Sequence, residues 1–408
     1  MKRENSFKWI GFLLFVLVLL VGKQSYSAEV RGVTDKVIKI GIGASLTGPG
    51  APIAIPMNNA IRTYIRYIND KGGIHGRKVK LITEDDRYSI PAALANLKKL
   101  VYKDKVLAMI GFGGTGCIIA QFAGIEREKM PYISLSQSEI MVSPFKKYIF
   151  NCGATYLDEI KLLIDYMMKD QKASNPKIGF VTAALDFGKS GLATARERAT
   201  LYGFKIVDVE YIAPGALDAG TQVLNLKMKG ADHVIIHHFA SAVVATIKGA
   251  KMLGYSPNFY GFCMAFTEDV IKICGESAKK FIGTHAFSCW YEDNPGIRKM
   301  REITLKYDPG TEKVIRTNPY TQGWVGALIL TEGMMRAGRN LNNETLVDAL
   351  EGIKNLDTEG ITGIISYSPD NHKAHSYCRI YRGDVNKGIH IPITDWRRPL
   401  SAEEIQKN

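Results

Sequence analysis

Cysteine is scarce in this sequence, and its spacing indicates neither a redox pair nor a metal site. There are six cysteines among 408 residues, and none forms the C-x-x-C pair typical of redox proteins and structural zinc sites. A chain of this length can build a core without cross-links, so we expect free, buried thiols. A disulfide from Cys263 to Cys274 or Cys289 is the alternative, and spacing alone does not decide it.

Basic clusters and enzyme motifs are also missing. The formal net charge is +13, but no run of five basic residues occurs, so we expect solvated charged faces and no nucleic-acid partner. No G-x-S-x-G elbow is present. The GKS at 188–190 has Ala183 where a phosphate-binding loop needs its first glycine. His237 and His238 are adjacent and point to opposite faces of a strand. We therefore predict neither an enzyme, nor a metal, nor a cofactor.

The longest apolar run lies at the N-terminus. Three basic residues, Lys2, Arg3 and Lys8, precede the apolar segment at residues 9–21, and small residues follow that segment up to Ser27. This is the tripartite plan of a secretory signal peptide, so we expect residues 1–27 to be removed and the mature chain to be exported. A retained anchor is the alternative, but the run is short for the roughly 20 residues of a membrane span. No cysteine lies near the cleavage point for lipid attachment.

Strand-like and helix-like segments alternate along the chain in two series. Such alternation predicts right-handed βαβ units with parallel strands, and two series predict two α/β sheets. The length also fits two domains. Helices dominate from about residue 295, and short strand-like pieces at 363–368, 377–382 and 389–393 close the chain. In the two series the expected strands are 37–46, 78–86, 106–111, 131–136, 177–183, 204–212, 232–240 and 259–264.

Residues 111–116 read GFGGTG between an expected strand and an expected helix, which matches a dinucleotide loop. That loop also needs an acid about 20 residues further on, at the end of the next strand. The next strand ends in SLSQS, with no acid until Glu139, so we reject the dinucleotide. Hydroxyls of Thr115, Ser136 and Ser138 beside a helix N-terminus could instead hold a carboxylate. On the residues alone, capping and turn formation explain these hydroxyls slightly better.

The order of motifs resembles the periplasmic binding proteins of ABC importers for branched-chain and other hydrophobic amino acids. The resemblance spans nearly all of the expected mature chain and rests on IGIGASLTGPGA, NDKGGIHGRKVKL, MIGFGGTGCIIA, KMPYISLSQS and LDFGKSG. It implies two Rossmann-like lobes joined by three hinge crossovers, near Asn151, Thr284 and Ile364, which close on a small ligand. The implied lobes are residues 28–150 with 285–364, and residues 151–284 with 365–408.

The resemblance also implies a role for the hydroxyls. In this family the glycine loop and the serine-rich strand end hold the ligand carboxylate, and these places fall on Thr115, Ser136 and Ser138. The resemblance therefore favours carboxylate binding by these hydroxyls over a role limited to capping. A further implication is a monomeric, non-enzymatic receptor in the periplasm, which delivers its ligand to an ABC permease at the inner membrane.

The second lobe departs from the amino-acid-binding pattern. The acid that holds a ligand ammonium in this family is replaced by Cys263, and tyrosines common in the second lobe are replaced by Phe187 and Phe239. An aromatic position of the first lobe falls on Ile53. Burying an ammonium without a counter-charge costs several kcal/mol. We therefore expect a hydrophobic carboxylate without an α-ammonium, such as an aromatic, branched or short-chain acid. If an amino acid binds instead, Asp186 is the first candidate to hold its ammonium.

Two alternatives stay open at this stage. One is a receptor for branched-chain amino acids themselves. The other is a ligand-sensing subunit that presents its closed form to a signalling receptor.

Overall fold

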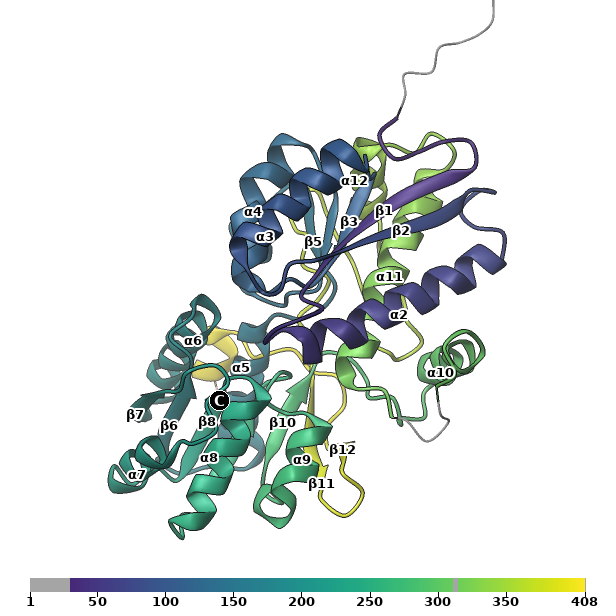
Figure 1. Cartoon of the computed structure of the whole chain (residues 1–408). Coiled ribbons are helices and arrows are strands. Elements are labelled where there is room, and N and C mark those ends of the chain that lie inside the picture. The colour runs from purple at the N-terminus through teal and green to yellow at the C-terminus, as the bar shows by residue number, and fades with distance from the viewer. Residues whose placement is uncertain (1–29, 311–314, 408) are drawn as a thin grey trace, which may run out of the picture.

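The computed structural model describes residues 30–310 and 315–407 as two α/β lobes, each built on its own sheet (Figure 1). The expected signal peptide, residues 1–27, lies outside the described residues. Within the part that is described, no helix is long and apolar enough to cross a membrane. All six cysteines are free thiols, as predicted, and only Cys263 is partly exposed.

The first lobe contains a parallel sheet with the strand order β2-β1-β3-β4-β5. Ile38, Ile40 and Ile42 of β1, an interior strand, are completely buried, because helices cover both faces of a parallel sheet. The strands are β1 (Val37–Ala44), β2 (Lys78–Asp85), β3 (Ala108–Gly111), β4 (Tyr132–Ser134) and β5 (Ile149–Asn151). The helices around it are α2 (Ala51–Asp70), α3 (Ile90–Lys98), η1 (Lys99–Lys103), α4 (Thr115–Arg127), η2 (Glu139–Met141), α10 (Pro295–Tyr307), α11 (Asn318–Ala337) and α12 (Asn343–Glu351).

Helices α2 and α11 pack against each other across one face of this sheet. The buried face of α2 includes Met57, Ile61, Ile65 and Ile68, the spacing of one helical stripe. Gly323 makes the close approach possible, because a Cβ there would lie 2.4 Å from the Met57 carbonyl oxygen. The C-terminal part of the chain thus completes the first lobe.

The second lobe contains a mixed sheet with the order β12-β11-β10-β9-β8-β6-β7. Its parallel strands are β6 (Lys177–Thr182), β7 (Lys205–Tyr211), β8 (His233–His237), β9 (Asn258–Gly261) and β10 (Ile282–His285). The last two, β11 (Arg379–Asp384) and β12 (Ile389–Pro392), are antiparallel. Its helices are α5 (Tyr156–Asp165), η3 (Tyr166–Asp170), α6 (Asp186–Tyr202), α7 (Gly220–Met228), α8 (Ala240–Met252), α9 (Glu268–Cys274), η4 (Gly275–Ala278) and α13 (Ala402–Gln406).

The C-terminal strands differ from the expectation of purely parallel sheets. A short turn joins β11 to β12, and a turn of this length allows only an antiparallel pair, since a parallel pair needs a long crossover. The strand-like segment 363–368 is not a strand. It contributes only isolated bridges, such as the one between Leu356 and Ile365.

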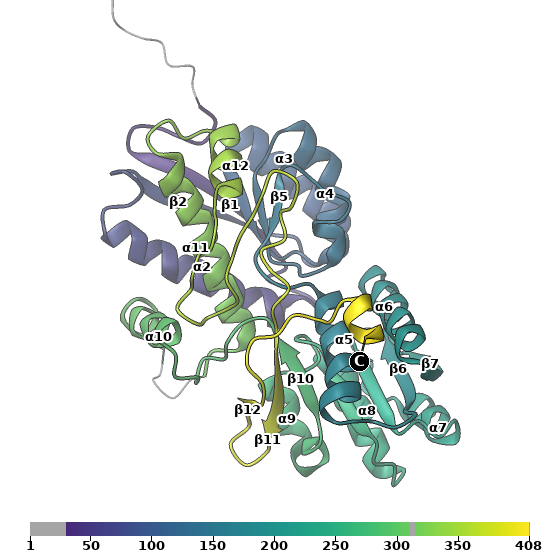
Figure 2. The same ribbon diagram turned by 180° about the vertical axis from the view of Figure 1, so that it is seen from behind.

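Three segments connect the lobes, and hydrogen bonds tie them to one another. The chain passes from the first lobe to the second after Asn151 and back to the first lobe after His285. It returns to the second lobe through residues 361–379, the extended yellow-green segment in Figure 2. Tyr367 donates its hydroxyl proton to the Asn151 carbonyl at 2.6 Å, and the Thr362 hydroxyl donates to the Ala286 carbonyl at 2.5 Å. We propose the lobe division 28–150 with 285–364, and 151–284 with 365–408.

Candidate functional site

The carboxyl ends of the central strands in both sheets point toward the region between the lobes (Figure 1). Ligands of open α/β sheets bind beyond such strand ends. Helix α4 of the first lobe contacts α6 of the second. The loops that precede these two helices are therefore candidates for a site between the two lobes.

The structure brings the predicted hydroxyls of the first lobe together. Thr115 begins α4, and the Ser136 hydroxyl lies 2.9 Å from that of Thr115. The backbone N–H of Ser138 donates to Ser136 Oγ at 3.3 Å. All three residues are buried. We call Thr115, Ser136 and Ser138 the hydroxyl cluster. It lies at the N-terminus of α4, where free N–H groups favour an anion.

The glycines of GFGGTG serve a purpose that the sequence did not reveal. A Cβ on Gly113 would lie 1.9 Å from a carboxylate oxygen of Asp86, and one on Gly114 would lie 2.4 Å from the Tyr88 ring. Asp86 is buried and accepts hydrogen bonds from the Ser45 hydroxyl and from the Tyr88 N–H. Two of the glycines are therefore needed so that the loop can pack on the chain's own side chains.

Tyr156 is a candidate site residue that the sequence analysis did not name. It begins α5 directly after Thr155, whose side chain forms a capping box with Asp158. The T-x-x-D spacing indicates this helix start, but not which residue Tyr156 meets. The Tyr156 hydroxyl is buried without a hydrogen-bond partner among the described residues. Burial raises its pKa well above the ordinary value, and the nearby Ser136 hydroxyl acts in the opposite direction.

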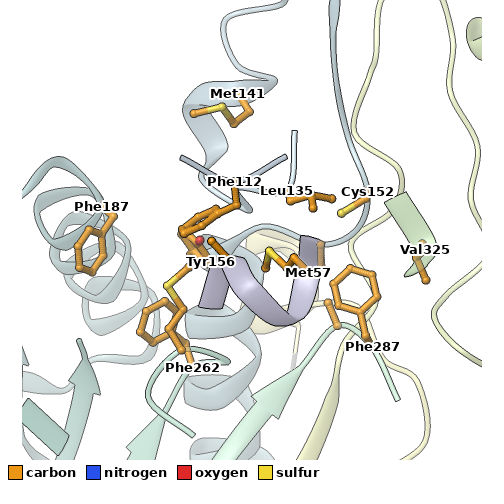
Figure 3. Close-up of a cluster of buried hydrophobic side chains, with 14 of the residues drawn as sticks. Met57, Phe112, Leu135, Met141, Cys152, Tyr156, Phe187, Phe262, Phe287 and Val325 are labelled. Carbon is orange, nitrogen blue, oxygen red and sulfur yellow. The ribbon is translucent and has the colours of Figure 1, made fainter. Parts of the chain in front are cut away.

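An aromatic cluster lies next to Tyr156 within the second lobe. Phe187 and Phe239, both predicted, have ring centroids 5.3 Å apart. Phe262, which was not predicted, lies 5.2 Å from the Tyr156 ring and 6.4 Å from that of Phe187. We call Phe187, Phe239 and Phe262 the aromatic wall. Figure 3 shows Tyr156 grouped with Phe262, with Phe187 projecting from α6 beside them.

His237 supports this wall from the sheet below. Its ring centroid lies 4.0 Å from that of Phe262, and its Nε2 lies 3.0 Å from the Phe187 carbonyl oxygen. Burial lowers the pKa of His237 to about 3, so the imidazole is neutral at physiological pH. His237 is therefore a packing residue behind the wall.

Cys263 has a buried acid as its neighbour, and this acid was also missed. The Cys263 N–H donates to Glu159 Oε2 at 2.7 Å, and the Thr284 hydroxyl donates to the same oxygen at 2.9 Å. Gln137 donates to the other oxygen at 3.2 Å and accepts from the Cys263 thiol at 3.5 Å. Glu159 is completely buried, and burial raises its pKa from 4.5 to about 7.

The two remaining predicted residues lie at the margins of this arrangement. Ile53 is partly buried in the first turn of α2 and packs against the core. Asp186 is exposed in the first turn of α6, a position where an acid stabilises the helix dipole. Among the described residues, Glu159 and not Asp186 is the acid in direct contact with Cys263.

Comparison with known proteins agrees with this architecture. Leu/Ile/Val-binding protein homolog 3 of Brucella melitensis is 26% identical over 355 residues, which are 86% of this chain and 92% of the relative. A branched-chain amino acid ABC transporter protein from Thermus thermophilus with bound valine has a TM-score of 0.82 at 24% identity, covering 90% of this chain and 97% of its own. A fatty acid ABC transporter substrate-binding protein from Thermomonospora curvata has a TM-score of 0.80 at 24% identity, covering 93% and 96%.

A match to a family model decides which family the chain belongs to. The model described as periplasmic binding protein matches residues 37–388. That range contains the hydroxyl cluster, the aromatic wall and every strand of the first sheet. The likeness to the solved structures supports the same fold. This chain belongs to the periplasmic binding protein family.

Proposed function

We propose that this protein is a periplasmic receptor of an ABC importer and that it captures a small hydrophobic carboxylate without an α-ammonium group. Tyr156 is the observation that carries the proposal. Its hydroxyl lies beside Ser136 of the hydroxyl cluster, and its ring contacts Phe262 of the aromatic wall. The hydroxyl cluster and the aromatic wall thus lie on either side of one side chain, that of Tyr156. This arrangement suits a small molecule with one charged end.

The hydroxyl cluster supplies the polar end of the proposed site. Thr115 and Ser136 offer hydroxyl donors, and the first N–H groups of α4 lie next to them. Hydrogen bonds to a charged group contribute about 1.5–3 kcal/mol each. Tyr156 adds a hydroxyl that has no partner among the described residues, and a buried polar group without a partner is unfavourable until a ligand supplies one.

The aromatic wall supplies the apolar end. Phe187 and Phe239 carry no hydroxyl where the family resemblance places tyrosines, so they offer surface without a hydrogen bond. His237 behind them is neutral because burial lowers its pKa to about 3. A branched, aromatic or short aliphatic chain fits such a surface.

The surroundings of Cys263 favour a ligand without an ammonium. The Cys263 thiol is neutral, because burial raises its pKa well above the ordinary value. Both Glu159 oxygens already accept hydrogen bonds from the chain, from Gln137 on one side and from Cys263 and Thr284 on the other. An ammonium would have to take one of these acceptors. The bound valine of the Thermus protein and the fatty acid named for the Thermomonospora protein indicate that the fold serves both kinds of carboxylate.

Glu159 also supports the second candidate, a receptor for branched-chain amino acids. An ionised Glu159 beside Cys263 could neutralise a ligand ammonium if the local hydrogen bonds rearranged. In either case we propose a monomer that closes by rotation about the three connecting segments and presents its closed form to the permease. The family and fold are those of substrate-binding proteins.

A stabilisation panel tests the proposal. The purified mature protein is heated with leucine, valine and phenylalanine, and with the matching acids that lack the amino group, together with benzoate and phenylacetate. A ligand that binds only the folded state adds about 2.7 kcal/mol at 100 times its dissociation constant. We expect stabilisation by the des-amino acids alone. Equal stabilisation by the amino acids would support the second candidate instead.

Removing the Tyr156 hydroxyl separates ligand binding from stability. Tyr156→Phe is expected to weaken binding of the best acid by about 10- to 100-fold, the loss of one hydrogen bond to a charge. The unfolding free energy should stay equal or rise, because the variant no longer buries a polar group without a partner. Calorimetric titration and urea unfolding measure the two quantities. Unchanged affinity would place the carboxylate elsewhere.

A further inference from the structure

A buried group of potential metal ligands lies at the edge of the second sheet, outside the proposed ligand site. His285 ends β10, Cys289 lies in the connection that follows, and His390 is in β12. One ligand atom of each residue lies within 4.8 Å of the other two. His285 Nε2 is 3.0 Å from His390 Nδ1, and Cys289 Sγ is 4.0 Å from the same nitrogen.

Glu268 completes the group with a carboxylate oxygen. It is the first residue of α9 and is 2% exposed. Its Oε1 lies 3.9 Å from His390 Nδ1, the nitrogen shared by the other two contacts. Two imidazoles and one thiol thus lie within 4.8 Å of one another, and a carboxylate oxygen lies beside one of the imidazoles.

We propose that His285, Cys289, His390 and Glu268 bind one Zn²⁺ ion. Imidazole, thiolate and carboxylate are the ligands that zinc takes, in a closed tetrahedral site, at bond lengths of about 2.0–2.3 Å. Such bonds separate the donor atoms by roughly 3.3–3.6 Å. The distances from His390 Nδ1 to the other three donors are 3.0, 4.0 and 3.9 Å, on either side of that range. A thiolate and a carboxylate also balance the charge of the ion, which matters because all four residues are buried.

Backbone and side-chain contacts hold the segments that carry these donors, whereas His285 Nδ1 and His390 Nε2 have no hydrogen-bond partner among the described residues. The backbone N–H of His390 donates to the Tyr291 hydroxyl at 2.5 Å, and the Tyr291 hydroxyl in turn donates to Glu268 Oε1 at 3.5 Å. The Cys289 N–H donates to Glu292 at 2.6 Å. The Phe266 ring stacks on His390 with centroids 4.1 Å apart and an interplanar angle of 27°. These contacts fix the orientation of the donors and exclude water.

The position of the group suggests a structural role for the ion. It would join α9, β10 and β12 to the start of the segment that leads from His285 back to the first lobe. A metal there would fix one end of a connection that has to bend when the lobes close. The four donors are spread from residue 268 to residue 390, so no spacing motif in the sequence marks them.

Metal content and cobalt substitution test the proposal on the whole protein. We expect one zinc ion per chain in protein purified from the periplasm, and a lower melting temperature after chelation that zinc restores. Replacement by Co²⁺ should produce a thiolate-to-cobalt charge-transfer band in the near ultraviolet. Cys289→Ser should abolish this band. Tyr291→Phe should keep the band while weakening metal affinity about 10–100-fold, as expected for an outer-shell hydrogen bond.

Cys274→Ser is the matched control. Cys274 is a buried thiol at the other end of the helix that begins with Glu268, and its replacement should leave the cobalt band intact. A cobalt band that survives in Cys289→Ser, or a melting temperature of the native protein that neither chelator nor zinc changes, would overturn the proposal. The chelation measurement uses the native protein, so it decides the question even if Cys289→Ser fails to fold.

Discussion

Thr115→Ala and Ser136→Ala should each weaken binding of the best carboxylate ligand by about 10- to 100-fold, the value of one hydrogen bond to a charged group. The two hydroxyls lie 2.9 Å apart at the N-terminus of α4, where they can donate to the same carboxylate. Calorimetric titration at fixed ionic strength measures the loss. Because the two side chains share one anion, the double variant should lose less than the product of the single losses.

Two controls separate this effect from general damage. Thr115→Ser keeps the hydroxyl and should retain most of the affinity. Thr200→Ala removes an exposed hydroxyl that donates to the Arg196 carbonyl within α6, so affinity should not change. If Thr115→Ala binds the ligand as well as the native protein does, the hydroxyl cluster only caps the helix and turn, as the residues alone first indicated.

Glu159→Gln should change how stability depends on pH. Burial raises the pKa of Glu159 from 4.5 to about 7 in the folded protein, so the folded state holds a proton that the unfolded state has already lost. The stabilisation from this proton is complete below about pH 4.5 and is lost as the pH rises through about 7. A shift of this size corresponds to roughly 3 kcal/mol of unfolding free energy.

The comparison is made by urea unfolding at several pH values. Near pH 5 the native protein and Glu159→Gln should be about equally stable, and near pH 8 the variant should be more stable by roughly 3 kcal/mol. If the unfolding free energies of the two proteins changed with pH in parallel, the pKa of Glu159 would not be raised in the folded protein.

The elements of both sheets could be predicted because their apolar residues follow simple periods. The buried isoleucines of β1 and the stripe of Met57, Ile61 and Ile65 on α2 are local patterns. The antiparallel pair at the C-terminus could not be foreseen from alternation, because the hairpin of β11 and β12 follows from one short turn. The segment at 363–368 has strand-like composition, but it lies in a connection between the lobes and pairs only through isolated bridges.

Candidate site residues could be predicted only where a local sequence pattern marks them. Thr115 and Ser136 stand at the ends of recognisable strands, and the structure brings their hydroxyls together. The contact of Glu159 with Cys263 spans 104 residues of sequence, and no local pattern in α5 marks it. The sequence offered the exposed Asp186 as the first candidate to hold a ligand ammonium, and the contact of Glu159 with Cys263 adds a second acid that no local pattern marks.

The glycine loop illustrates how the same residues can fit several explanations. GFGGTG matches a dinucleotide pattern, yet Gly113 and Gly114 are required because Asp86 and Tyr88 pack against the loop. A pattern of glycines records where backbone and side chains approach closely. What approaches them is decided by the fold, and here it is the chain itself.

Calorimetric titration of the native protein with leucine and with 4-methylpentanoate tests the central claim most directly, because the two molecules differ only in the α-ammonium. The account predicts binding of 4-methylpentanoate and none of leucine at the same concentrations, since Cys263 and the hydrogen-bonded Glu159 leave an ammonium without a free counter-charge. Leucine binding as tight as that of 4-methylpentanoate, or tighter, would contradict it and would identify the protein as an amino-acid receptor.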